Sequence, residues 1–123
     1  MRNGKYVVLT VDDDQDVIDG VTMILEANGY IVESAMNGKA GLAKYMESDP
    51  DFVLVDMMME SVSAGMDLAM ALKALGKKPV YMLSSMSDGL TQIADPSSQG
   101  LDGALQKPLD PDVLLDILRT RLS

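Results

Sequence analysis

Short apolar runs of the kind that form buried strands alternate along this chain with segments of helical periodicity. Three of the runs are clear, at about residues 5–11, 52–56 and 79–84. Continuous apolar runs of this length are typical of strands that are buried on both faces of a sheet. Strands that alternate with helices form a parallel sheet with helices on both of its faces. The alternation therefore predicts an α/β protein.

The remaining elements fit the intervals between these strands. A second short strand begins at Tyr30, and residues 103–106 fit a short edge strand. Apolar residues at helical spacing, with capping residues or Gly and Pro at the ends, predict four helices. Their apolar positions are Val17, Val21, Ile24 and Leu25; Leu42, Tyr45 and Met46; Leu68, Leu72 and Leu75; and Val113, Leu114, Ile117 and Leu118. Residues 90–94 allow a further short helix, which would complete five strand–helix repeats.

The predicted topology brings several acidic side chains to one edge of the sheet. In a flavodoxin-like, doubly wound five-stranded sheet of order 2-1-3-4-5, the first and third strands are neighbours. Asp12 and Asp13 follow the first strand, and Asp56 ends the third. Because sites in such sheets form beyond the carboxyl ends of the strands, we expect these three carboxylates in one cleft. Asp14 and Asp16 are expected instead to be solvated or to cap the following helix.

Three carboxylates in one cleft predict a bound divalent cation. Each pair would repel by roughly 3 kcal/mol at about 5 Å and an effective dielectric constant of about 20. The chain has no Cys and no His, and all-oxygen ligands favour Mg²⁺. Ser84 closes the fourth strand and Lys107 follows the fifth, and a hydroxyl and an ammonium can bind phosphoryl oxygens. An Asp carboxylate can act as a nucleophile, so Asp56 is expected to accept a phosphoryl group while Asp12 and Asp13 hold the metal.

Four motifs resemble those of response-regulator receiver domains, the family of the bacterial chemotaxis response regulator. They are VVLTVDDDQD, DFVLVDMMM, PVYMLSS and GALQKPLDPDVL, and they occur in the family's order. The resemblance covers nearly the whole chain. It implies that residues 1–123 form a single receiver domain with no output domain.

The resemblance also assigns roles to individual residues. It implies that Asp56 is the phosphoacceptor, while Ser84 and Lys107 take the places of the family's hydroxyl residue and its lysine. The residues that it assigns to the Mg²⁺ site are Asp12, Asp13, Asp56 and, through its backbone carbonyl, Met58. Such a domain assists its own phosphorylation and dephosphorylation but is not an enzyme.

Several positions depart from the family pattern or modify it. Glu60 stands where the family usually has Pro, and Ala104 stands where most relatives have Tyr or Phe. In those relatives the aromatic ring follows the hydroxyl residue when phosphate binds, which Ala104 cannot do. We therefore expect another route to the output, through movement between residues 86 and 101. The resemblance places Met58 and Met86 at positions that tune phosphate loss in this family, and two apolar side chains there predict slower autodephosphorylation.

Charge and composition constrain the partners. The net charge of −9 argues against direct DNA or RNA binding, because phosphate contacts need clusters of Lys and Arg. The resemblance implies a sensor histidine kinase or a histidine phosphotransfer protein as phosphodonor, and an unidentified protein as target. No apolar run is long enough to span a bilayer and no signal peptide is evident, so the expected location is the cytoplasm. Most of the eleven methionines are expected to fill gaps in the core.

Three other functions remain open. A small phosphatase of the haloacid-dehalogenase type would also use a strand-end Asp with Mg²⁺, and Asp12-x-Asp14 matches its opening motif. Such an enzyme needs a further acidic pair late in the chain, however, whereas Asp56 precedes Lys107. A degenerate receiver would keep the fold without being regulated by phosphate, and the departures at residues 60 and 104 favour it. A phosphorelay intermediate would use the same site and pass its phosphoryl group to a histidine phosphotransfer partner.

Overall fold

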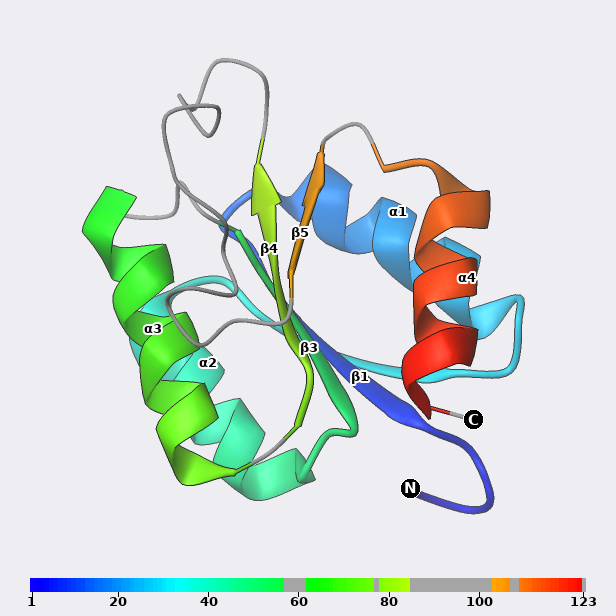
Figure 1. Cartoon of the computed structure of the whole chain (residues 1–123), viewed down its shortest axis with the longest axis horizontal. Helices are drawn as coiled ribbons and strands as arrows, with labels where there is room; N and C mark the ends of the chain where they lie inside the picture. Colours follow the sequence, from blue (N-terminus) through cyan, green and yellow to red (C-terminus); the bar gives the residue numbers. More distant parts are fainter. Residues whose placement is uncertain (57–61, 77, 85–102, 107–108, 123) are drawn as a thin grey trace.

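The chain forms a parallel sheet between two pairs of helices (Figure 1). This computed structural model describes residues 1–56, 62–76, 78–84, 103–106 and 109–122. The strands are β1 (Val7–Val11), β2 (Ile31–Ala35), β3 (Phe52–Asp56), β4 (Val80–Ser84) and β5 (Gly103–Gln106). Their order is β2-β1-β3-β4-β5, and every neighbouring pair is parallel. The predicted α/β class and strand order are confirmed.

Within the described residues the chain has four helices, which are α1 (Gln15–Glu26), α2 (Gly38–Ser48), α3 (Val62–Leu75) and α4 (Pro111–Leu122). They cover the sheet, α2 and α3 on one face and α1 and α4 on the other, as can be followed in Figure 1. Side chains of α2 and α3 pack with Leu9, Val11 and their neighbours on one face. Side chains of α1 and α4 pack with Val8, Phe52 and their neighbours on the other. Alternate residues of the central strands thus point into different cores, which is why these strands are apolar throughout.

The first two helices begin at side chains that cap them. Asp14 caps α1 by accepting the N–H of Asp16 at 2.9 Å, and Asn37 caps α2 by accepting the N–H of Ala40 at 2.7 Å. Shortly after α1 the chain turns at Gly29, whose φ of 88° favours glycine. The capping role expected at the start of α1 is therefore confirmed for Asp14. The possible helix at residues 90–94 lies outside the described residues.

The expectation that the methionines fill the core is wrong for most of those whose side chains are described. Met82 is buried, whereas five others are exposed: Met1, Met23, Met36, Met46 and Met70. On α2 the reason is the orientation of the helix. A Cβ atom on Gly41 would lie 3.0 Å from the Val11 side chain, so α2 packs tightly against β1 through its Gly41 and Tyr45 face. Leu42 and Met46 consequently face outward.

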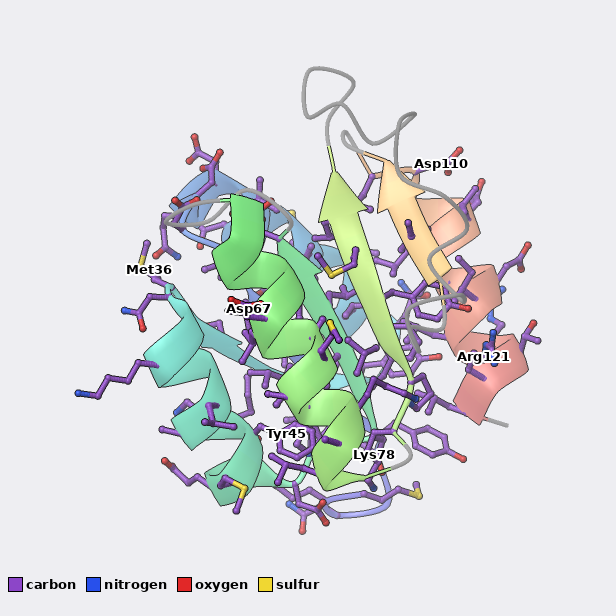
Figure 2. The ribbon with its side chains drawn as sticks, turned by 60° about the vertical axis from the view of Figure 1, so that its left-hand side comes forward. Met36, Tyr45, Asp67, Lys78, Asp110 and Arg121 are labelled. Atoms are coloured by element: carbon purple, nitrogen blue, oxygen red, sulfur yellow. The ribbon has the colours of Figure 1, made fainter. Side chains whose placement is uncertain are left out.

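The two ends of the sheet carry different sets of side chains. Figure 2 shows Lys78 and Tyr45 near the amino ends of the strands, and Asp110 near their carboxyl ends. None of the helices within the described ranges is long and apolar enough to cross a membrane.

Candidate functional site

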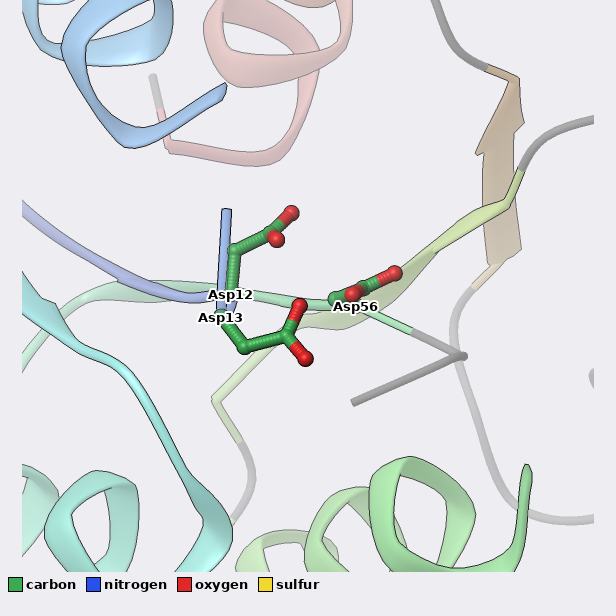
Figure 3. Close-up of side chains that lie close together, drawn as sticks. All are labelled: Asp12, Asp13 and Asp56. Atoms are coloured by element: carbon green, nitrogen blue, oxygen red, sulfur yellow. The ribbon is translucent and has the colours of Figure 1, made fainter. Parts of the chain in front are cut away.

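Three carboxylates gather beyond the carboxyl ends of β1 and β3 (Figure 3). The two strands are neighbours and Val11 pairs with Val55, so the next residue of each chain segment lies at the same edge. Asp12 is fully buried, Asp56 is 2% exposed, and Asp13 is exposed. Ligand oxygens of the three side chains all lie within 4.8 Å of one another. The predicted gathering of the three carboxylates is therefore present, with one member open to solvent.

The loop after β1 holds Asp12 in place. Its backbone N–H donates to the carbonyl of Ala35 at the end of β2, at 3.0 Å. Its Oδ1 accepts the N–H of Asp14 at 2.9 Å, and Asp14 in turn caps α1. The acids that follow β1 therefore have two different roles. Asp12 and Asp13 face Asp56, whereas Asp14 caps α1.

The donor set of this cleft fits a hard divalent cation. At the observed spacing each pair of ionised carboxylates repels by roughly 3 kcal/mol if the effective dielectric constant is about 20. Bonds to Mg²⁺ measure about 2.1 Å, so two oxygens bound to one ion lie about 3 to 4 Å apart. The carboxylate oxygens could bind the same ion after moving slightly closer together, or through a water molecule between a carboxylate and the ion. Carboxylates without imidazole or thiolate ligands suit Mg²⁺ better than a transition metal.

The other predicted site residues are described only in part. Ser84 is the last residue of β4, the strand beside β3, and it is in register with Gln106 of β5. Lys107, Met58 and Glu60 lie outside the described residues, as does Met86. The roles predicted for these side chains therefore stay predictions.

Two further residues bear on the sequence predictions. Ala104 is in register with Met82 and packs against the core under α2 and α3, where the family's usual aromatic residue is absent. Thr10 lies inside the apolar run of β1, two residues before Asp12, and its side chain is fully buried. Its Oγ1 has no hydrogen-bond partner within the described part of the chain. The sequence prediction treated residues 5–11 as an apolar run, although Thr10 places a hydroxyl within it.

A groove of about 380 Å³ opens elsewhere, between β4 and the carboxyl-terminal half of α4. It is lined by Tyr81, Asp116, Ile117, Thr120 and Arg121. The Tyr81 hydroxyl accepts the Nε–H of Arg121 at 3.0 Å, and its ring stacks on Phe52 at 5.1 Å between centroids. Gly103 leaves room for that ring, because a Cβ there would lie 2.7 Å from it. None of the three clustered carboxylates lines this groove.

Comparison with known proteins gives a family match over most of the chain. The family described as "Response regulator receiver domain" matches residues 8–119. The DNA-binding response regulator MtrA of Mycobacterium tuberculosis is 30% identical over 122 residues, which are 99% of this chain and 53% of that protein. The chain thus spans about half the length of this relative.

Solved structures agree with that match. A putative response regulator from Chloroflexus aurantiacus superimposes with a TM-score of 0.83 at 27% identity, covering 96% of this chain and 98% of that one. The chemotaxis response regulator CheY4 of Vibrio cholerae gives a TM-score of 0.82 at 29% identity, with coverages of 96% and 99%. Similarity in sequence and similarity in fold therefore point to the same family.

Proposed function

The chain belongs to the response regulator receiver domain family, and we propose that it accepts a phosphoryl group on Asp56 in an Mg²⁺-dependent reaction. The observation that carries this proposal is the gathering of Asp12, Asp13 and Asp56, whose ligand oxygens lie within 4.8 Å of one another at the carboxyl edge of the sheet. Two of the three carboxylates are buried, which costs free energy and favours a function for them over a solvated surface role.

In the proposed reaction an Asp56 carboxylate oxygen attacks the phosphorus of a phosphohistidine. A P–O bond forms and the P–N bond breaks, and the departing imidazole nitrogen keeps the bonding electron pair and takes up a proton. Asp12 and Asp13 would hold Mg²⁺ beside Asp56, together with the backbone carbonyl of Met58. When bound, Mg²⁺ supplies positive charge against the phosphoryl oxygens. The remaining oxygens of the product would be bound by Ser84 and Lys107.

Membership of the family implies that the chain is a regulatory protein and that a histidine kinase is its partner. The type of phosphodonor and the way in which the chain acts are part of the proposal. We propose that the phosphodonor is a sensor histidine kinase or a histidine phosphotransfer protein. We also propose that residues 1–123 act as one receiver domain in the cytoplasm, through contact with a protein target. MtrA is named as a DNA-binding regulator, but this chain spans only about half of it, and a net charge of −9 disfavours direct contact with nucleic acid.

Intact mass after incubation with acetyl phosphate tests the proposal directly. We expect wild type to gain one phosphoryl group when Mg²⁺ is present and none when Mg²⁺ is removed. Asp56→Asn should gain none. Asp67→Asn is the matched control, because it changes an exposed acid of α3 that is not a member of the carboxylate cluster.

The outcomes separate the proposal from its rivals. A folded wild type that gains no mass would contradict phosphorylation and favour a degenerate receiver that acts by binding alone. A gain that persists in Asp56→Asn would assign the nucleophile elsewhere. Loss of the phosphoryl group to a histidine phosphotransfer protein in a second incubation would identify a phosphorelay intermediate.

A further inference from the structure

A second aspartate lies at the opposite end of β3 from Asp56, and its carboxylate joins three segments of the chain. Asp51 comes directly before β3, and its side chain is 13% exposed. Its Oδ2 accepts the backbone N–H of Val7 at 2.8 Å. The Met1 ammonium lies 3.1 Å from Oδ2, and Lys78 Nζ lies 3.9 Å from Oδ1. Asp51 thus contacts the chain where β1 begins and where β4 is about to begin.

The contact with Val7 starts the pairing between β1 and β3. The Asp51 N–H donates to the Val7 carbonyl at 2.7 Å while the Asp51 side chain accepts the Val7 N–H. Asp51 alone therefore binds both the N–H and the carbonyl of Val7. The preceding Asp49 is in the left-handed region with φ of 47°, and Pro50 follows it, so the chain ends α2 and turns just before Asp51 and β3. The carboxylate supplies the acceptor for Val7 at this turn.

A tight turn brings the Met1 ammonium to the same carboxylate. Asn3 and Gly4 have φ of 54° and 79°, the combination that a two-residue hairpin turn requires. Two backbone hydrogen bonds between Arg2 and Lys5, of 2.8 and 3.0 Å, close the turn. Figure 1 shows the start of the chain folded back beside the amino end of β1.

The ladder between β1 and β3 is short, and the site depends on it. Only four residue pairs connect the two strands, from Val8 with Phe52 to Val11 with Val55. A five-residue strand spans about 16 Å, and at its far end the site residues from both strands must fit one cation. Because Mg²⁺ demands nearly ideal octahedral geometry, a small shift of β1 along β3 would change its affinity.

We propose that Asp51 is a positioning residue for the acidic site, which it serves by holding the start of β1 against the start of β3. This inference rests on the proposed function, since it concerns the same metal site. Asp51 touches none of the three clustered carboxylates in the described contacts. It acts through the two strands that carry them.

Calorimetric titration with Mg²⁺ on three variants tests this role. Asp51→Ala removes the acceptor for Val7 and the charge, and we expect Mg²⁺ affinity to fall roughly threefold or more. Asp51→Asn keeps an oxygen acceptor, so most of the affinity should return. Asp49→Asn is the matched control, because Asp49 also lies 3.9 Å from Lys78 and its loss removes the same charge from the same end of the sheet. Asn tolerates the left-handed backbone there.

Each outcome decides for or against the role of Asp51. Affinity lost in Asp51→Ala, and retained in Asp51→Asn and Asp49→Asn, supports positioning. A folded Asp51→Ala that binds Mg²⁺ as wild type does, although it unfolds more easily, would show a purely structural residue and overturn the inference. If Asp51→Ala does not fold, Asp51→Ser is used instead, because the shorter serine side chain lengthens the hydrogen bond from the N–H of Val7. Failure of the proposed function would appear in wild type itself, as an absence of Mg²⁺ binding or phosphorylation, and not only in the variants.

Discussion

In the contacts of the described residues, the two ends of β3 place the same residue type beside charges of opposite sign. At the amino end, Asp51 lies beside the Met1 ammonium and Lys78 and accepts a backbone N–H. At the carboxyl end, Asp56 lies within 4.8 Å of the ligand oxygens of two other aspartates. The first arrangement compensates a charge with cations of the chain itself. The second concentrates like charges, as a site for a cation from solution does.

The difference teaches which carboxylates stabilise the fold and which cost stability. An exposed or partly exposed ion pair contributes at most about 1 kcal/mol, and a hydrogen bond to a charged group about 1.5 to 3 kcal/mol. Repulsion within the acidic cleft is of similar size and opposite sign. Burial alone therefore does not tell the two kinds of aspartate apart; the charges around them do.

The largest expected effect concerns Mg²⁺ binding at the carboxyl end. Asp12→Asn keeps an oxygen that can accept the N–H of Asp14 but removes the charge that faces Asp56. We expect Mg²⁺ affinity to fall about tenfold or more, since even groups behind the ligands change affinity by about that factor. Calorimetric titration measures it, with Asp67→Asn as control. An unchanged affinity would mean that Mg²⁺ binds elsewhere.

The next largest effect is a change in the free energy of unfolding, which should have opposite signs at the two ends of β3. Without Mg²⁺, removing one of the three charges by Asp56→Asn should raise the free energy of unfolding by about 1 kcal/mol or more, because its repulsion with Asp12 and Asp13 is relieved. Solvent around the exposed Asp13 screens part of that repulsion. Asp51→Asn should lower the free energy of unfolding by about 1 kcal/mol, because the Met1 ammonium loses the carboxylate beside it and Lys78 loses one of its two acidic neighbours. Urea unfolding in the presence of a chelator measures both. If both variants changed the free energy of unfolding in the same direction, the contrast between the two ends of β3 would be wrong.

The sequence predicted the gathering of three aspartates at the carboxyl end and almost nothing of the contacts at the amino end. Strand-end acids can be read in order along a chain, and the parallel topology alone brings Asp12, Asp13 and Asp56 together. The contacts of Asp51 instead depend on how separate loops meet in space, which no periodicity encodes. Its one readable signal was the Asn3-Gly4 pair, which is typical of a tight turn.

Packing accounts for the other errors of the sequence prediction. Helical spacing marks Leu42 and Met46 as apolar positions of α2, but it does not fix which side of the helix meets the sheet. The close approach of Gly41 to Val11 decides that, and it leaves both larger side chains outside. Hydrophobicity alone favours the larger residue for the core, whereas here the smallest residue sets the distance between helix and sheet.

A smaller effect should follow from blocking the α-amino group of Met1. Acetylation removes the ammonium that lies 3.1 Å from Asp51, and we expect a loss of about 0.5 kcal/mol in the free energy of unfolding, as for a half-exposed ion pair. The control is the same modification in Asp51→Asn, where it should change little. A loss of equal size in both backgrounds would assign the effect to the turn and not to the ion pair.

The smallest effect concerns Tyr45, which lies near the amino end of the sheet and is influenced by the carboxylate of Asp49. Burial, and then the negative charge of Asp49, raise the pKa of Tyr45 above its usual 10.0. The neutral phenol is thus favoured in the folded chain, and its contribution to stability is complete below pH 10 and is lost as the pH rises through the higher folded value. Tyr45→Phe should therefore show a shallower fall in stability than wild type between about pH 9 and pH 11. Asp49→Asn should fall between the two, because it removes the charge and leaves the burial. Denaturant unfolding at a series of pH values gives the slopes, and identical slopes for wild type and Tyr45→Phe would mean that folding does not raise the pKa of Tyr45.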